Sequence, residues 1–272
     1  MKEFVRYLLG EEISSLQIGL FDVWHFLYLF VIFFSAILVA ALMRKKSSEA
    51  KDKVLRIYAY LVIGFYIADF FLMPLSDSYD RISVDKLPFH VCTLAGVFVP
   101  FVQFNPKFAK IRSVIVTLAI ASSMMWMCYP GSALGGQPPF SYIIFQTFIY
   151  HGLLFSWGFL HLALGKTVLS FRKIWMELAA VLIILVWATL GNTLYDAQNW
   201  FFVEYSIFPF LTDEIMPPVV VFCVFGTCFL VYCAFYGVRG IARRVGGKGK
   251  SSLDSAAPES ESSKEKELAG RT

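Results

Sequence analysis

Seven long apolar runs limit what this chain can fold into more than any other feature of its sequence. A membrane-spanning helix needs about 20 mostly apolar residues, and charged or Pro- and Gly-rich stretches separate the runs from one another. The pattern predicts an all-α fold, a polytopic membrane helical bundle of about seven transmembrane helices. The predicted helices cover residues 22–43, 54–74, 87–104, 111–129, 140–164, 174–195 and 217–238.

The composition agrees with this fold class. Hydrophobic residues make up 57% of the chain and charged residues only 16%, whereas a soluble domain carries about 25% charged residues. We expect an N-terminal interfacial segment at 1–21, the transmembrane domain at 22–238, and a cytoplasmic tail at 239–272 that is first basic and then disordered. The net charge of +4 belongs to loops and tail, so no nucleic acid is expected as a partner.

The distribution of Lys and Arg predicts the orientation of the bundle, because cytoplasmic loops carry an excess of both residues. All but four of the 24 basic residues lie in or beside the first, third and fifth loops or follow the last helix. The four on the other side are Lys2, Arg6, Arg81 and Lys86. The N-terminus is therefore predicted to lie outside or in a lumen, and the C-terminus in the cytoplasm.

Polar residues inside the predicted helices gather in the outer half of the bundle. A polar, ionisable group within a bilayer costs free energy, so it is usually functional or tightly paired. One shared polar cavity that opens outward would explain why a single leaflet holds them all. These residues are His25, Asp69, His90, Cys92, His151, Asn192 and Tyr195.

Cys92 and His151 form the predicted catalytic pair. A cysteine reacts as the thiolate and needs a general base to reach that state. His151 lies at a matching depth, and Thr147, one helical turn away, could orient its ring. The alternatives are an inert core thiol at Cys92 and a hydrogen-bonded structural histidine at His151.

Three further polar residues are predicted to support the pair. On a regular helix His90 points about 200° away from Cys92, which suits a residue that orients a substrate head group, supports the site indirectly or is purely structural. His25 and Asp69 could bond to each other or to His90. Asp69 could instead extend to the membrane surface.

The end of the sixth predicted helix supplies Asn192 and Tyr195. Asn192 could donate a hydrogen bond to an oxyanion, or it could cap the helix. His161 lies in the inner half of the bundle beside a basic loop, and we interpret it as interfacial.

Four sequence features point to a known family. They are the Leu-Pro-x-His-x-Cys motif at 87–92, the Gly- and Pro-rich loop at 130–139, the His-Gly pair at 151–152 and the Asn- and Tyr-rich end of the sixth helix. Together they resemble the YwaF-like integral membrane family, which includes transmembrane protein 164. The resemblance covers most of residues 20–238. It places the family's cysteine and histidine on Cys92 and His151, and a further family histidine on His25.

The resemblance implies a membrane acyltransferase that acts on phospholipids through an acyl-cysteine intermediate, without a cofactor and without a metal. The expected partners are the membrane itself and phospholipid and lysophospholipid substrates. The expected location is the endoplasmic reticulum or another endomembrane in a eukaryote, and the plasma membrane in a bacterium.

Two other classes of function remain open from the residues alone. One is a metal-dependent intramembrane lipid hydrolase with ligands drawn from His25, His90, His151 and Asp69, although the H-E-x-x-H pattern of such enzymes is absent. The other is a proton-coupled transporter or a receptor, in which the buried histidines carry protons or bind a ligand.

Overall fold

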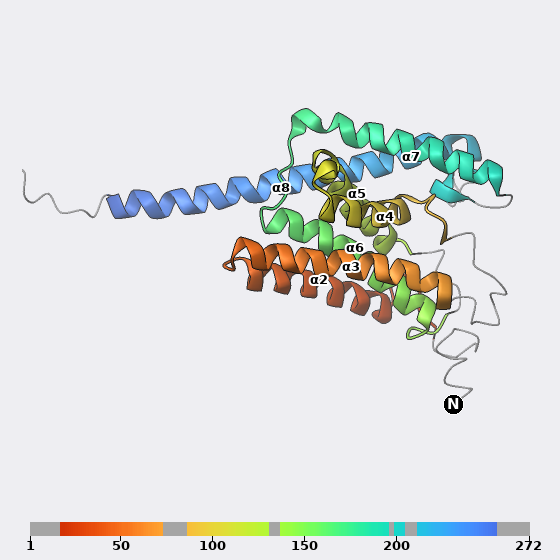
Figure 1. Cartoon of the computed structure of the whole chain (residues 1–272), viewed down its shortest axis with the longest axis horizontal. Helices are drawn as coiled ribbons and strands as arrows, with labels where there is room; N and C mark the ends of the chain where they lie inside the picture. Colours follow the sequence, from red (N-terminus) through yellow and green to blue (C-terminus); the bar gives the residue numbers. More distant parts are fainter. Residues whose placement is uncertain (1–16, 73–85, 131–136, 196–198, 205–210, 255–272) are drawn as a thin grey trace, which may run out of the picture. The chain divides into compact units, whose positions relative to one another are not determined.

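The computed structural model describes residues 17–72, 86–130, 137–195, 199–204 and 211–254, with side chains up to residue 241. All secondary structure within these ranges is helical (Figure 1). Residues up to Tyr232 form one compact unit and residues from Cys233 on form a second. The site described below lies entirely in the first unit.

Within the described ranges, six helices are long and apolar enough to cross a membrane, and a seventh, α4, is apolar but has only 14 residues. The predicted polytopic helical bundle is therefore confirmed. The last helix continues to Asp254, beyond the end predicted at 238. The helices are α2 (Val23–Met43), α3 (Ser48–Leu72), α4 (Val91–Phe104), α5 (Arg112–Cys128, preceded by the 3-10 helix η3, Pro106–Ile111), α6 (Tyr142–Ala163), α7 (Trp175–Leu194) and α8 (Met216–Asp254).

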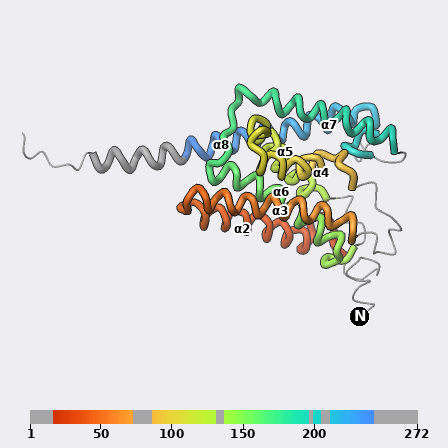
Figure 2. The backbone as a smooth tube through the Cα atoms, viewed as in Figure 1, coloured from red at the N-terminus to blue at the C-terminus, as the bar shows by residue number. Residues whose placement is uncertain are grey.

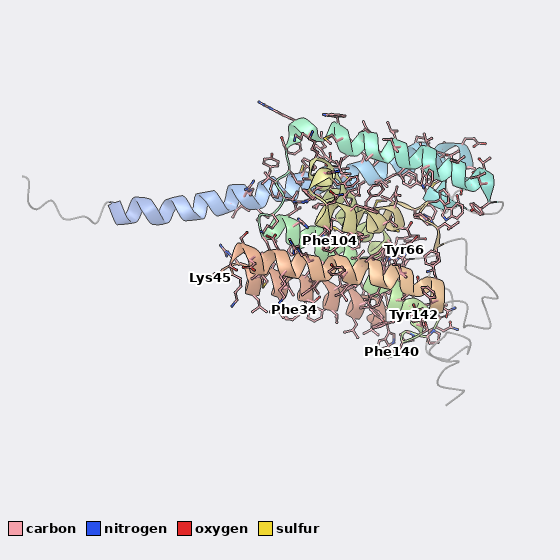
Figure 3. The ribbon with its side chains drawn as sticks, in the orientation of Figure 1. Phe34, Lys45, Tyr66, Phe104, Phe140 and Tyr142 are labelled. Carbon is pink, nitrogen blue, oxygen red and sulfur yellow. The ribbon has the colours of Figure 1, made fainter. Side chains whose placement is uncertain are left out.

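Within the first unit, α2 to α7 run alternately in opposite directions (Figure 2). We call the end at which α2, α4 and α6 begin the cysteine end, because α4 carries Cys92. Tyr66 near the end of α3 and Tyr142 at the start of α6 lie toward it, and Lys45 lies at the opposite end (Figure 3).

Helices α5 and α6 form the core of this unit, and most of their residues are buried. α6 packs against α2, α3, α4 and α5, while α5 also contacts α4 and α7. Gly158 of α6 allows the two central helices to approach closely, since a Cβ there would meet the Ile120 side chain and the Val116 carbonyl of α5. Small residues at helix contacts give membrane bundles their van der Waals packing. The outer helices α2 and α3 instead expose apolar side chains, as lipid-facing helices do.

Candidate active site

Helix α4 begins at Val91, four residues later than predicted. The residues before it form a tight turn in which the Phe89 N–H donates to the Leu87 carbonyl at 2.8 Å. Packing against α7 holds the turn in place: the Trp187 indole donates to the Pro88 carbonyl at 2.9 Å and stacks on the Phe89 ring. Tertiary contacts therefore override the apolar pattern that predicts a helix from residue 87.

His90 is the N-cap of α4 and has an extended backbone, so of His90 and Cys92 only Cys92 lies on the helix. The regular-helix geometry predicted for the two residues does not apply. The His90 Nδ1 accepts a hydrogen bond from the Phe201 N–H at 3.3 Å, and its ring lies 5.8 Å from that of Phe202. His90 thus connects the start of α4 to the short 3-10 helix η5 (Trp200–Phe202).

Cys92 is the second residue of α4 and is half-buried. The first hydrogen bond of the helix runs from the Leu94 N–H to the His90 carbonyl, so the three preceding N–H groups have no acceptor within the helix. Two of them belong to Cys92 itself and to its neighbour Thr93. Free N–H groups and the helix dipole both favour negative charge at this position.

Tyr150 of α6 fixes the position of Cys92 in the bundle. Its hydroxyl donates to the Cys92 carbonyl at 3.0 Å and lies against Gly96, where any Cβ would collide with it. Tyr150 is eight residues beyond the start of α6, which is about 12 Å along the helix axis. The start of α4 therefore lies level with the third turn of α6 and not with the first residue of that helix. Sequence reasoning missed Tyr150 because it is one of many aromatic residues in an apolar helix.

His151 is buried, and its two ring nitrogens have different surroundings. Nδ1 lies 2.8 Å from the Thr147 carbonyl, which can only accept, so Nδ1 carries the proton. Nε2 is then an acceptor, and it is buried with no hydrogen-bond partner among the described residues. The ring stacks on Trp126 with centroids 4.1 Å apart. Thr147 thus orients the ring, but through its carbonyl and not through the hydroxyl.

His25 lies at the start of α2 and has protein partners on both ring nitrogens. Nδ1 accepts from the Phe21 N–H at 3.1 Å, and Nε2 donates to the Met127 carbonyl of α5 at 2.8 Å. Asp22 caps the helix by accepting from the His25 N–H at 2.8 Å. His25 is thus fully occupied in joining the start of α2 to the end of α5.

Asp69 is buried near the end of α3, and both of its carboxylate oxygens have partners. Tyr142 donates to Oδ1 at 2.9 Å, and the Lys86 ammonium lies 3.0 Å from Oδ2. Tyr66 completes this group by donating to the Lys86 carbonyl at 2.7 Å. Asp69 does not bond to His25 or to His90; it fixes the segment that leads into α4.

Asn192 binds the backbone of Trp200 with both ends of its amide. Its Nδ2 donates to the Trp200 carbonyl at 3.2 Å, and its Oδ1 accepts from the Trp200 N–H at 2.9 Å. The amide therefore holds η5 in place and is not free to bind an oxyanion. The Tyr195 ring packs near those of Phe89 and Trp200, in the same aromatic group.

The sequence-predicted residues thus fall into two groups. Cys92 lies where α4 meets Tyr150 of α6, and His151, the next residue after Tyr150, stacks on Trp126 of α5. His25, Asp69, His90, Asn192 and Tyr195 bind or pack against other parts of the cysteine end. In particular, both ring nitrogens of His25 and both carboxylate oxygens of Asp69 already have protein partners. The four residues named for a metal site therefore do not form one ligand set.

A second polar cluster lies at the opposite end of the unit, and His161 is part of it. His161 is only 2% exposed. Its Nε2 donates to the Gln103 Oε1 at 2.9 Å, and its Nδ1 lies 3.1 Å from the Thr167 hydroxyl. The Trp157 indole donates to the same Gln103 oxygen at 3.0 Å. Every ring nitrogen in this cluster has a partner.

Glu177, also near the opposite end, is a buried polar residue that sequence reasoning missed. Its Oε1 accepts from the Tyr232 hydroxyl at 2.7 Å. The only signal in the sequence is a single acidic residue near the start of an apolar run.

The fold defines a multi-pass integral membrane protein. Residues 20–236 match the TMEM164 family, and the chain belongs to this family. No curated protein matches the chain, and no solved structure does either.

Proposed function

We propose that this protein is an integral membrane acyltransferase that moves acyl chains between phospholipids, with Cys92 as the nucleophile and His151 as the general base. One observation carries the proposal. The His151 Nε2 is buried without a partner among the described residues while Nδ1–H is fixed on a carbonyl. This is the tautomer in which a histidine accepts a proton at Nε2.

Two further observations support the pairing of His151 with Cys92. The His151 ring lies edge-on to the Tyr150 ring with centroids 5.4 Å apart, and the Tyr150 hydroxyl bonds to the Cys92 carbonyl. Cys92 also lies at the start of α4, where the helix favours an anion. A direct contact or one bridging water would then carry the proton from thiol to ring.

In the first half-reaction, the His151 Nε2 takes the proton of the Cys92 thiol, and the sulfur attacks the ester carbonyl of a donor phospholipid. The N–H groups of Cys92 and Thr93 would hold the resulting oxyanion, since the Asn192 amide is already occupied. The carbon–oxygen ester bond breaks, the proton on His151 passes to the leaving lysophospholipid oxygen, and a thioester remains on Cys92.

In the second half-reaction, a lysophospholipid hydroxyl gives its proton to His151, and its oxygen attacks the thioester. The carbon–sulfur bond breaks, and the proton returns to the Cys92 sulfur. Buried apolar surroundings keep water from the thioester, which favours transfer over hydrolysis.

Intact-mass spectrometry of the purified protein after incubation with mixed phospholipid vesicles tests the proposal. We expect an added acyl mass that hydroxylamine removes, and that is lost in the Cys92→Ala variant. In the His151→Gln variant the acyl-protein should form far more slowly.

The matched control is Cys128→Ala, because Cys128 lies exposed at the end of α5 near the same end of the bundle. This variant should acquire the acyl mass like the unaltered protein. An acyl mass that persists in Cys92→Ala, or the absence of any acyl mass with every phospholipid in the mixture, would contradict the proposal.

A further inference from the structure

The proposed mechanism leaves Lys86 without a role, although its position is unusual. Among the residues that the structure describes, it is the only Lys or Arg at the cysteine end, because the others lie at the opposite end or in the second unit. It opens the segment that leads into α4, six residues before Cys92. A cation at this place is the group that the anionic part of a substrate would meet.

Two contacts hold Lys86 in position. Its ammonium pairs with the Asp69 carboxylate at 3.0 Å, and its backbone carbonyl accepts from Tyr66 at 2.7 Å. The Lys86 side chain is 24% exposed, while that of Asp69 is only 3% exposed. Since an ammonium has three N–H donors, and Tyr142 shares the negative charge of Asp69, Lys86 keeps donors for a second anion on its open side.

Lys86 also lies close to the proposed chemistry. Tyr66, which binds the Lys86 carbonyl, has its ring 6.2 Å from that of Tyr150, and Tyr150 binds the Cys92 carbonyl. A phospholipid has the same order of groups, with an anionic phosphate toward the bilayer surface and the acyl esters deeper. A phosphate on Lys86 would therefore place an ester on the side where Cys92 lies.

We propose that Lys86 binds the phosphate of the lipid substrate, so that the site accepts phosphate-bearing glycerolipids in preference to neutral glycerides. The effect of Lys86 on the acyl-transfer rate rests on the proposed function. Phosphate binding itself does not require an acyl-cysteine. Lysine is a common point-charge ligand for phosphate, and water-poor surroundings strengthen the pairing.

The first test measures binding without chemistry. Full-length Cys92→Ala protein in nanodiscs cannot form a thioester, so it is titrated with a diether phosphatidylcholine and with the matching diether glycerol. We expect tighter binding of the phosphatidylcholine. Replacing Lys86 alone would leave Asp69 buried and unpaired, so the variant is Asp69→Asn with Lys86→Gln. It should bind the phosphatidylcholine about tenfold to a hundredfold more weakly and the diether glycerol as before.

The matched control removes the other ion pair, Lys166 with Asp52, whose ammonium and carboxylate lie 2.7 Å apart at the opposite end. Asp52→Asn with Lys166→Gln should leave binding of both lipids unchanged. Lys86→Arg keeps the positive charge and should restore most of the phosphatidylcholine binding. Equal loss for both lipids in the Asp69/Lys86 variant would overturn the proposal, since it would mean that the pair is only structural.

Two further measurements complete the test. The first distinguishes a lipid phosphate from free phosphate, and the second distinguishes failure of the phosphate site from failure of the proposed acyltransferase. Inorganic phosphate that displaces the diether phosphatidylcholine at equal concentration would assign the site to free phosphate and overturn the lipid assignment. In protein with Cys92 intact, the acylation rate with phosphatidylcholine should fall in the Asp69/Lys86 variant, and the rate with diacylglycerol should not. Headgroup-dependent binding without any acylation would refute the acyltransferase and leave the phosphate site standing.

Discussion

His151 and His161 lie ten residues apart on the same helix, and both are buried, yet their ring nitrogens differ. At the opposite end, His161 has a partner on each nitrogen, supplied by Gln103 and Thr167. At the cysteine end, His151 has one partner, and its Nε2 meets no hydrogen-bonding group among the described residues. A buried polar atom without a partner costs about 1–3 kcal/mol. Burial of a histidine in a membrane bundle is therefore weak evidence of function, whereas a buried ring nitrogen without a partner is stronger evidence.

The largest effect should come from replacing Cys92, the proposed nucleophile at the cysteine end. Cys92→Ala removes the proposed nucleophile, so acyl transfer should fall to the level of protein-free vesicles. Transfer of a labelled acyl chain from phosphatidylcholine to a lysophospholipid measures this. Cys128→Ala should keep full activity. Full activity in Cys92→Ala would contradict the assignment of Cys92 as the nucleophile.

The two histidines should respond in opposite ways to the same substitution. His151→Gln should lower kcat by about 10²- to 10⁴-fold, the usual contribution of a general base, with little change in stability. His161→Gln should cost about 1–3 kcal/mol of stability because it breaks a satisfied buried cluster, while activity per folded molecule persists. Thermal unfolding in detergent, measured beside acyl transfer, separates the two outcomes. Similar behaviour of both variants would show that the free nitrogen is not what distinguishes them.

The α4–α6 contact should be sensitive to a single methyl group. Gly96→Ala places a Cβ where the Tyr150 hydroxyl lies, and such overpacking costs about 1–3 kcal/mol. Gly64→Ala on α3 is the control, because a Cβ there meets nothing within 4 Å. It should be neutral or stabilising by up to about 1 kcal/mol. Equal unfolding temperatures for the two variants would contradict the close contact between Tyr150 and α4.

The smallest effect should come from the Tyr150 hydroxyl itself. Tyr150→Phe removes one hydrogen bond to the Cys92 carbonyl, worth about 1 kcal/mol, and should slow acyl transfer by about fivefold. Tyr28→Phe is the matched control, since the Tyr28 hydroxyl also donates to a carbonyl, that of Pro139, at 2.7 Å. It should lose similar stability and keep its rate. Should both variants slow alike, Tyr150 would have no special part in positioning Cys92.

Apolar length and loop composition are enough to predict the helical membrane fold, because spanning helices must be long and continuously apolar. The late start of α4 could not be predicted in this way. It depends on Trp187 and Phe89, which lie far apart in the sequence and meet only in the folded bundle.

The candidate site shows the same limit. Depth along the helices proposes Cys92 and His151 as a pair, but it does not show which histidine has a ring nitrogen without a partner. The difference lies in single atoms: the Met127 carbonyl satisfies the His25 Nε2, and no described atom does so for His151. Sequence periodicity carries no information about such partners. Tyr150 and Lys86 were missed for the same reason.

The shortness of α4 has a consequence for how a substrate arrives. Its 14 residues rise about 21 Å, less than the roughly 30 Å of a hydrocarbon core. The Cys92 carbonyl also meets Tyr150, eight residues into α6, so we infer that the first turn of α4 lies below the bilayer surface. Under the proposed function, a lipid reaches Cys92 by lateral diffusion and never leaves the bilayer. The rate should then follow the mole fraction of substrate in the membrane and not its bulk concentration. Diluting the substrate with an inert diether lipid at constant total substrate should slow the reaction, a surface-dilution behaviour that a site open to water would not show.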